Sequence, residues 1–310
     1  MKMLTPEITE MIHSYAAGKG YEVRMVSSER LRELEDELET RKQTDGFNAA
    51  FYSERLASFR YAPLTFRRCR SVILFSVPQP GMVLLFHYNG RDYHVYMPPT
   101  YDYTIDSLIE KDIRNILAGS DHSIEKAIIP LKLLAVRSGL AEYGRNNICY
   151  LYRKGSYHRL AAFLSSLPCP RESWMPARFM DQCQTCTHCA RACPTGAIDK
   201  NRLLLRAELC MTFHNEHAGE FPAFIKPSYH HCLFGCMICQ RACPENRLHP
   251  EQVVVKEKFS AEETALILNN CPIPEIPLHT RQKLEEALLM DDYPLLSRNL
   301  AHCIQHLKYS

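Results

Sequence analysis

The 310-residue sequence lacks any long run of hydrophobic residues. No stretch approaches the roughly 18 uninterrupted apolar residues that a membrane-spanning helix requires. The first twenty residues also lack the apolar core of a secretory signal, and they carry Glu7 and Glu10. We therefore expect a cytoplasmic protein that does not enter a membrane.

The sequence also lacks an excess of charge of one sign. Lysine and arginine together number 37 and aspartate and glutamate 35, so the formal net charge is +2. This balance does not indicate a nucleic-acid-binding protein or one that binds membrane surfaces. One local basic group could meet phosphates, but a solvated face explains it better: Arg60, Arg67, Arg68 and Arg70.

Cysteine, in contrast, is abundant, with fourteen residues. Thiols stay reduced in the cytosol, so a cysteine-rich cytosolic chain typically binds metal or carries out redox chemistry. Five scattered cysteines are expected to be small buried residues: Cys69, Cys149, Cys169, Cys271 and Cys303. The other nine lie between Cys183 and Cys243, which predicts a metal centre in that region.

The pattern of hydrophobic residues divides the chain into three regions and predicts an α+β fold. Residues 1–165 alternate helix and strand, which favours an α/β sandwich domain. Residues 166–250 are rich in Pro and Cys and are expected to form a module held together by its metals. Residues 251–310 are expected to be a helical C-terminal segment, with helices at 261–268, 280–289 and 295–307.

Within residues 1–165, the apolar run SVILFSV at 71–77 predicts a buried strand. The dipeptide Asn89-Gly90 predicts a β-hairpin over residues 82–97. Further helices are expected at 5–18, 48–58, 104–118 and 123–138, and further strands at 21–26 and 147–153.

The cysteine-rich region contains an internal repeat. Residues 186–194 and 236–244 both read C-x-x-C-x-R-A-C-P, fifty residues apart. The first copy is preceded by Cys183 and therefore has the run C-x-x-C-x-x-C-x-x-x-C-P. In two-cluster ferredoxins, the fourth cysteine of such a run ligates the other 4Fe-4S cluster. The repeat therefore predicts two 4Fe-4S clusters that exchange ligands.

This pattern assigns seven of the eight ligands. Cluster one would take Cys183, Cys186, Cys189 and Cys243. Cluster two would take Cys193, Cys236 and Cys239 and needs one more, because Leu233 stands where a leading cysteine would be. Cys210 and Cys232 are the candidates. A zinc site that includes Cys210 and His214, and a disulfide framework, are weaker alternatives, because this run is not a zinc-ribbon pattern.

The chain resembles the epoxyqueuosine reductase family, which is related to the corrinoid-dependent reductive dehalogenases. The resemblance lies in MDQCQTCTHCARACPTGAI at 180–198, in Cys210-Met-Thr-Phe and in FGCMICQRACPEN at 234–246, which follow the order of the family's eight cysteines. The segment LAVRSGLAEYGRNNI at 134–148 is similar to the block that precedes the clusters in that family. We expect a short form without the family's helical-repeat extension.

The resemblance implies a cobalamin in the N-terminal domain, which the clusters reduce and which then reduces an epoxide or a carbon–halogen bond. It supports Cys210 as the eighth ligand and implies that a four-residue segment lines the corrin: Gly144, Arg145, Asn146 and Asn147. The family's proton-donating Asp corresponds to Glu125 here, with Asp121 nearby as an alternative.

The resemblance further implies an electron donor such as a flavodoxin or a ferredoxin. It raises tRNA as a partner, which the charge of the chain does not support. The competing hypothesis is a ferredoxin-like electron carrier that binds no corrinoid and donates electrons to a partner protein.

Overall fold

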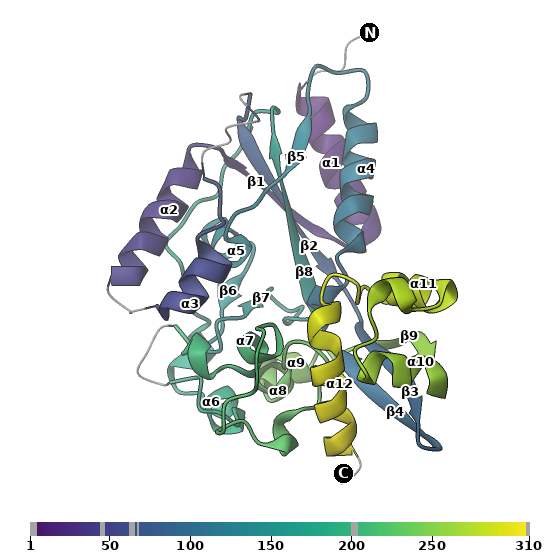
Figure 1. Ribbon diagram of the computed structural model, residues 1–310. Helices are drawn as coiled ribbons and strands as arrows, with labels where there is room; N and C mark the ends of the chain where they lie inside the picture. Colours follow the sequence, from purple (N-terminus) through teal and green to yellow (C-terminus); the bar gives the residue numbers. More distant parts are fainter. Residues whose placement is uncertain (1–4, 44–46, 62–65, 67, 200–203, 308–310) are drawn as a thin grey trace. The chain divides into compact units, whose positions relative to one another are not determined.

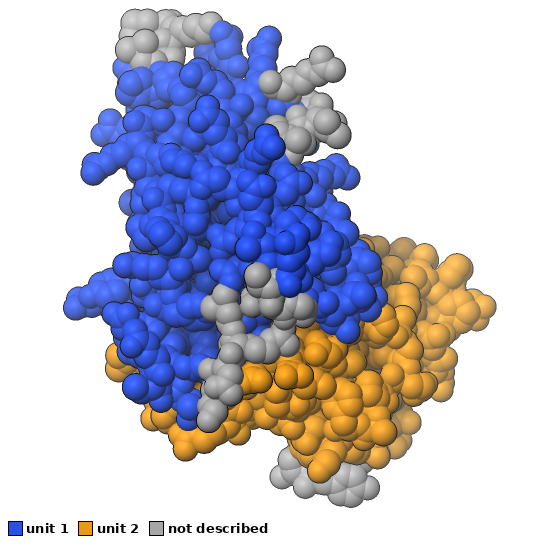
Figure 2. Space-filling view, turned by 90° about the vertical axis from the view of Figure 1, so that its left-hand side faces the viewer, with its two compact units in different colours: residues 1–78, 103–187, 200–204 blue, residues 79–102, 188–199, 205–310 orange. Residues whose placement is uncertain are grey.

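The computed structural model describes residues 5–43, 47–61, 66, 68–199 and 204–307. The chain divides into two compact units, each built from more than one segment (Figure 2). Unit 1 comprises Met1–Pro78, Tyr103–Thr187 and Lys200–Leu204, and unit 2 comprises Gln79–Asp102, His188–Asp199 and Leu205–Ser310. No helix in the described residues is both long enough and apolar enough to cross a membrane.

A four-stranded antiparallel sheet forms the centre of unit 1, in the order β1-β2-β8-β5. The run SVILFSV, predicted to be a buried strand, lies in β2, and its seven residues are all buried. The strands are β1 (Glu22–Ser27), β2 (Ser71–Pro78), β5 (Ile124–Lys126) and β8 (His158–Ser165).

Helices cover both faces of this sheet: α1 (Thr5–Lys19), α2 (Arg30–Arg41), α4 (Thr104–Leu117) and α5 (Leu131–Arg137). Val72 and Leu74 of β2 belong to one core, together with residues of α2 and α5. Ile73 and Phe75 belong to the other core, together with residues of α1 and α4. Alternate side chains of a strand point to opposite faces, and Figure 1 shows α1 and α4 across the sheet from α2. The arrangement confirms the α/β sandwich and the α+β class.

Unit 2 contains a second, three-stranded sheet in the order β4-β3-β9. β3 (Gly81–Tyr88) and β4 (Arg91–Met97) form the predicted hairpin, with Asn89 and Gly90 both at positive φ in the turn. β9 (Val253–Phe259) pairs parallel with β3. Three helices share one core with this sheet: α10 (Ala261–Leu268), α11 (Leu278–Glu286) and α12 (Tyr293–Leu307).

The two units differ from the ranges 1–165, 166–250 and 251–310 that we expected for the domains. The hairpin was expected in the N-terminal region, but it lies in unit 2 because β3 pairs with β9. The C-terminal region was expected to be helical, yet β9 precedes its helices. Hydrogen bonding between segments distant in sequence, which local patterns do not reveal, therefore joins the hairpin to the end of the chain.

Three local predictions in unit 1 also differ from the structure. The helix expected at 123–138 is strand β5 followed by the shorter α5, because Pro130 disfavours helical backbone at the residue before it. The helix expected at 48–58 is α3 (Ala49–Phe51) continued by the wider π-helical turn Tyr52–Leu56. The strand expected at 147–153 is reduced to β7 (Cys149–Tyr150), which pairs with β6 (Glu142–Tyr143).

A buried ion pair joins α4 to the sheet of unit 1. The Asp106 carboxylate accepts hydrogen bonds from Arg159 Nε at 2.6 Å and Nη2 at 2.7 Å, and Lys126 Nζ lies 2.9 Å away. Asp106 is only 3% exposed. Burial by itself would raise the pKa of this carboxyl, but Arg159 and Lys126 outweigh it and hold the pKa below its usual value.

We predict that Asp106→Asn lowers the free energy of unfolding by about 3 kcal/mol at neutral pH, because Arg159 loses its buried counter-charge. The pKa of Asp106 is lower in the folded chain than in the unfolded chain. Its stabilisation is therefore complete at neutral pH and is lost as the pH falls below about 4. Thermal unfolding followed by circular dichroism should show a difference that shrinks in acid.

Asp36→Asn, on the exposed side of α2, is the matched control and should change stability by less than about 0.5 kcal/mol. If Asp106→Asn loses no more stability than the control, or loses the same amount at pH 2 as at pH 7, this account of the ion pair is wrong.

Candidate metal centre

The two copies of C-x-x-C-x-R-A-C-P adopt similar local structures, with their helices in unit 2. Each forms a short helix, α6 (His188–Ala192) and α8 (Ile238–Arg241), and these two helices pack against each other. The amide of Cys193 donates to the Cys189 carbonyl at 3.0 Å, and the amide of Cys243 donates to the Gln240 carbonyl at 3.1 Å. The last cysteine of each copy therefore lies just beyond the helix that holds the preceding one.

Three predicted ligands of cluster two come together in unit 2. Burial raises the pKa of the Cys236 thiol, and the nearby sulfurs of Cys232, Cys210 and Cys193 raise it further. Burial also raises the pKa of Cys210, with a further contribution from Cys193. Cys210 precedes α7 (Met211–Asn215), and Cys239 lies within α8. These residues supply the thiol donors that an iron–sulfur cluster needs.

Cys232, the other candidate for the eighth ligand, has different surroundings. Cys232 is 2% exposed, and its backbone forms a β-bridge with Tyr96. Its carbonyl accepts a hydrogen bond from Cys303 Sγ at 3.4 Å. Burial raises the pKa of Cys232 to about 12, and the nearby thiol that adds to this shift is Cys303. Cys232 is thus near Cys236 but is part of the buried interior, whereas Cys210 is near both Cys236 and Cys193.

The zinc and disulfide alternatives find no support in this geometry. All fourteen cysteines lie in the described part of the chain, and none of them forms a disulfide. His214 Nε2 lies 2.8 Å from the carbonyl oxygen of Glu208, so this ring is already engaged by the backbone. Among the described residues, no three His, Cys, Asp or Glu side chains gather closely enough to hold a single metal ion. His231 Nε2 lies 3.9 Å from Cys236 Sγ.

The remaining predicted ligands are divided between the units. Cys183 and Cys186 belong to unit 1, and Cys189 and Cys243 belong to unit 2. In unit 1, the short 3-10 helix Asp181–Gln184 carries Cys183, and the Cys186 amide donates to the Gln182 carbonyl at 3.2 Å. Arg145 donates hydrogen bonds to backbone carbonyls of this ligand loop.

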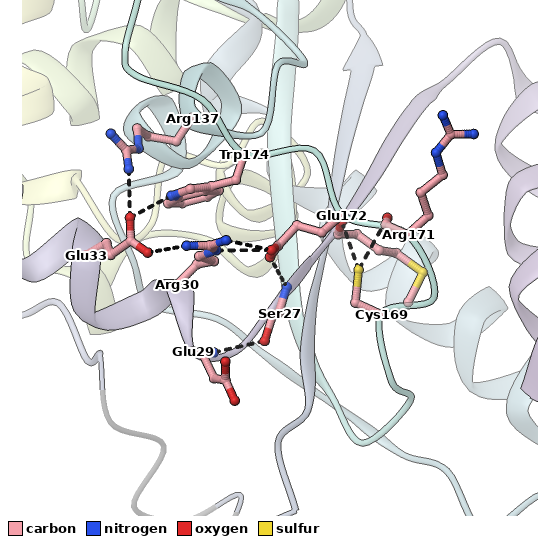
Figure 3. Close-up of polar contacts among 10 residues, drawn as sticks. Ser27, Glu29, Arg30, Glu33, Arg137, Cys169, Arg171, Glu172 and Trp174 are labelled. Atoms are coloured by element: carbon pink, nitrogen blue, oxygen red, sulfur yellow. Dashed lines mark hydrogen bonds and ion pairs between the residues drawn. The ribbon is translucent and has the colours of Figure 1, made fainter.

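The segment that leads into the ligand loop is anchored to unit 1 through the single tryptophan of the chain (Figure 3). Trp174 Nε1 donates to Glu33 at 2.8 Å, and the Arg137 guanidinium lies 4.8 Å from the tryptophan ring centroid and 2.8 Å from the same carboxylate. Arg30 pairs with Glu172 at 2.9 Å. This network was not predicted from the sequence, although a lone tryptophan just before a cysteine cluster was an available signal.

The four residues expected to line a corrin form a tight turn between β6 and β7. Asn147 has a φ of 56°, and its amide donates to the Gly144 carbonyl at 2.9 Å. Asn146 Nδ2 donates to the Tyr150 hydroxyl at 3.0 Å, and Asn146 Oδ1 accepts from the Ile148 amide at 3.3 Å. A Cβ at Gly144 would lie 2.5 Å from the Tyr150 ring, so a side chain does not fit there. The turn is therefore fully formed by contacts within unit 1.

The two candidate proton donors lie near one edge of the main sheet of unit 1. Glu125 is a partly buried residue of β5 and pairs in register with Leu164 of β8. Asp121 lines an open surface pocket of about 340 Å³ together with Arg68, Cys69, Arg70, His122 and Ser166. Of the four arginines of the local basic group, Arg68 and Arg70 thus border this pocket, whereas Arg67 lies outside the described residues.

The scattered cysteines are only partly as expected. Cys149 and Cys303 are buried, which confirms their interpretation as small buried residues. Cys69, Cys169 and Cys271 are partly exposed, which differs from that expectation.

The chain is similar to known proteins both in the cluster region and over most of its length. Residues 182–246 match a family described as a 4Fe-4S double cluster binding domain. The chain is 25% identical over 262 residues to the epoxyqueuosine reductase of Staphylococcus aureus, covering 80% of this chain and 67% of that protein. It is 31% identical over 169 residues to the epoxyqueuosine reductase of Bacillus subtilis, covering 52% of this chain and 41% of that protein.

The fold is also that of a solved epoxyqueuosine reductase, crystallised with a tRNA-Tyr epoxyqueuosine-modified stem loop. The TM-score is 0.69 at 19% identity, covering 98% of this chain and 83% of that one. At this identity the similarity shows a shared fold. The chain spans about half the length of most curated relatives that it matches.

The different surroundings of Cys210 and Cys232 lead to a prediction about iron content. After anaerobic reconstitution, Cys210→Ala should bind about four irons per chain instead of about eight, because one cluster loses a ligand. Cys232→Ala, the matched control from the same unit, should keep about eight. Iron analysis with electron paramagnetic resonance (EPR) of the reduced protein measures this. If Cys210→Ala keeps about eight irons and Cys232→Ala keeps only about four, then Cys232 and not Cys210 is the eighth ligand.

Proposed function

We propose that the chain is a member of the epoxyqueuosine reductase family and an iron–sulfur oxidoreductase. In this proposal, electrons pass through two 4Fe-4S clusters to a cobalamin that serves in reducing the substrate. The observation that carries the proposal is the pair of structurally equivalent cysteine repeats, α6 and α8, with Cys193, Cys210 and Cys236 close together in unit 2.

Two sets of four thiolates would hold the clusters. The first set is Cys183, Cys186, Cys189 and Cys243, and the second is Cys193, Cys210, Cys236 and Cys239. The donor chemistry fits, because these residues offer sulfur ligands and unit 2 brings three of the second set together. Cluster assembly must remove the thiol protons, since the thiolate is the ligand. Burial opposes that ionisation at Cys210 and Cys236, so the iron must supply the compensating charge.

The proposed cobalamin would lie against the turn formed by Gly144, Arg145, Asn146 and Asn147. When bound, a reduced cobalamin supplies a strongly nucleophilic metal for reductive cleavage of an epoxide. The turn can offer a preformed backbone surface, because Asn146 is already held by Tyr150 and Ile148. Gly144 lets this turn close against the Tyr150 ring, where a Cβ would not fit. These residues would therefore act through shape rather than through flexible polar groups.

Glu125 is the proposed proton donor, with Asp121 as the alternative. A carboxyl group can supply the proton that an opened epoxide needs if it lies within hydrogen-bonding reach of that oxygen. The substrate class that we favour is an epoxide carried on RNA, which is suggested by the relative crystallised with a modified tRNA stem loop. A flavodoxin or a ferredoxin would supply electrons, and the cytoplasm would keep the free thiols reduced.

A second candidate function is a ferredoxin-like electron carrier that binds no corrinoid. The observation that favours it is that the side chains of Arg145 and Asn146 in the proposed corrin-lining turn are engaged by protein groups. Such a carrier would use both clusters and would pass electrons to a partner protein.

Cobalamin binding distinguishes the two candidates. We predict that the anaerobically reconstituted protein retains about one cobalt per chain after addition of hydroxocobalamin and desalting, with a corrinoid absorption spectrum that differs from that of the free cofactor. Glu125→Gln should retain the cofactor to the same extent but lose turnover by about 100-fold, since general acid catalysis typically contributes that much. Glu142→Gln, just before the turn formed by residues 144–147, serves as the control and should keep both the cofactor and turnover.

No retained cobalt in a protein that holds about eight irons would reject the reductase and favour the carrier. Full turnover by Glu125→Gln would reject Glu125 as the proton donor and leave Asp121 to be tested in the same way.

A further inference from the structure

The guanidinium of Arg145 binds the loop that carries two predicted cluster ligands, Cys183 and Cys186. Its Nε donates a hydrogen bond to the Cys186 carbonyl at 3.1 Å. Its Nη2 donates to the Cys183 carbonyl and reaches the Gln184 carbonyl at 3.4 Å. All these residues belong to unit 1. The Arg145 side chain thus donates hydrogen bonds to three backbone carbonyls within residues 183–186 of the ligand loop.

Arg145 donates to these carbonyls from outside the loop. Asp181–Gln184 is a short 3-10 helix, and the amides of Thr185 and Cys186 both donate to the Gln182 carbonyl. The last carbonyls of a helix have no partner within it and carry partial negative charge. Arg145 satisfies them with a planar group whose N–H donors have a fixed geometry. The guanidinium therefore fixes the backbone on which Cys183 and Cys186 are mounted.

Arg145 is itself held in place by its turn. The Gly144 amide donates to the Ile148 carbonyl at 2.8 Å, and Lys132 Nζ donates to the Asn147 carbonyl at 3.1 Å. The turn in which Arg145 lies is thus fixed on both sides of the residue. A side chain anchored in this way holds its charge at a constant place beside the ligand loop.

The charge of Arg145 matters because a 4Fe-4S cluster becomes more negative by one unit when it takes up an electron. The potentials of such clusters depend on net charge and on hydrogen bonding around the ligands. A fixed cation beside two ligand residues favours the reduced state. We propose that Arg145 is a positioning residue that both orders the ligand loop and raises the reduction potential of the cluster ligated by Cys183 and Cys186. This inference rests on the proposed function, since it requires that cluster.

The test uses the full chain, reconstituted anaerobically and titrated with dithionite while the reduced clusters are followed by EPR. In Arg145→Met, the reduction equilibrium of one cluster should shift about tenfold toward the oxidised state, which is about 59 mV for a one-electron couple. The other cluster should keep its potential. Hydrogen–deuterium exchange in the peptide 180–187 should be faster than in the unaltered protein, because the loop loses its external donor.

Arg145→Lys separates the two effects. Lysine keeps the positive charge but lacks the planar fork that bridges several carbonyls. The potential should therefore return toward the value of the unaltered protein, while exchange in residues 180–187 remains fast. Arg178→Met is the matched control, because it removes an arginine of the same unit whose described ion pair is with the partly exposed Glu142, 3.2 Å away. It should leave both readouts unchanged.

Unchanged potentials and unchanged exchange in Arg145→Met, with about eight irons bound, would overturn the inference. Loss of one cluster in this variant, with the other intact, would support it. If Arg145→Met does not fold, slow exchange at 180–187 in Arg145→Lys overturns it. Failure of the unaltered protein to bind iron would instead reject the proposed function, so the two failures are distinguishable.

Discussion

The constraint on which the proposed centre depends is the short reach of a C-x-x-C-x-x-C loop. Such a loop supplies three sulfurs to one cubane, and the fourth must come from a distant part of the chain. Both repeats place their last cysteine in the same way, because Cys193 and Cys243 each lie just past a short helix that holds the preceding cysteine. The same constraint explains why the ligand region is built from short helices and turns.

The second requirement is that each ligand be held by a scaffold. In unit 2, β9 pairs with the hairpin β3–β4 and, with α10 and α12, closes a hydrophobic core that includes Leu233 and Phe234, immediately before Cys236. In unit 1, Trp174, Glu33 and Arg137 anchor the segment before Cys183, and Arg145 binds the ligand loop itself. Each unit thus supports its own cysteines through contacts outside the cysteine motif.

Periodic and repeated patterns allowed much of this to be predicted from the sequence. α1, α4 and β2 followed from apolar periodicity, the hairpin from Asn89-Gly90, and the proposal of two clusters with seven of their eight ligands from cysteine spacing. β8 and β9 were not predicted, because short apolar runs do not reveal which strands they pair with. β5 was predicted to be part of a helix, because the effect of Pro130 on the residue before it was underestimated. The contact of Arg145 with the ligand loop depends on a turn and a loop that are distant in sequence, so no local pattern indicates it.

The exchange of ligands between the two repeats is the central claim, and iron counts in paired variants test it most directly. Replacing Cys193 and Cys236 together by alanine should leave about four irons per chain, because both would belong to one cluster. Replacing Cys193 and Cys183 together should leave almost none, because they would belong to different clusters. Retention of about four irons in the Cys193 and Cys183 double variant would mean that these two residues share a cluster, and would contradict the account.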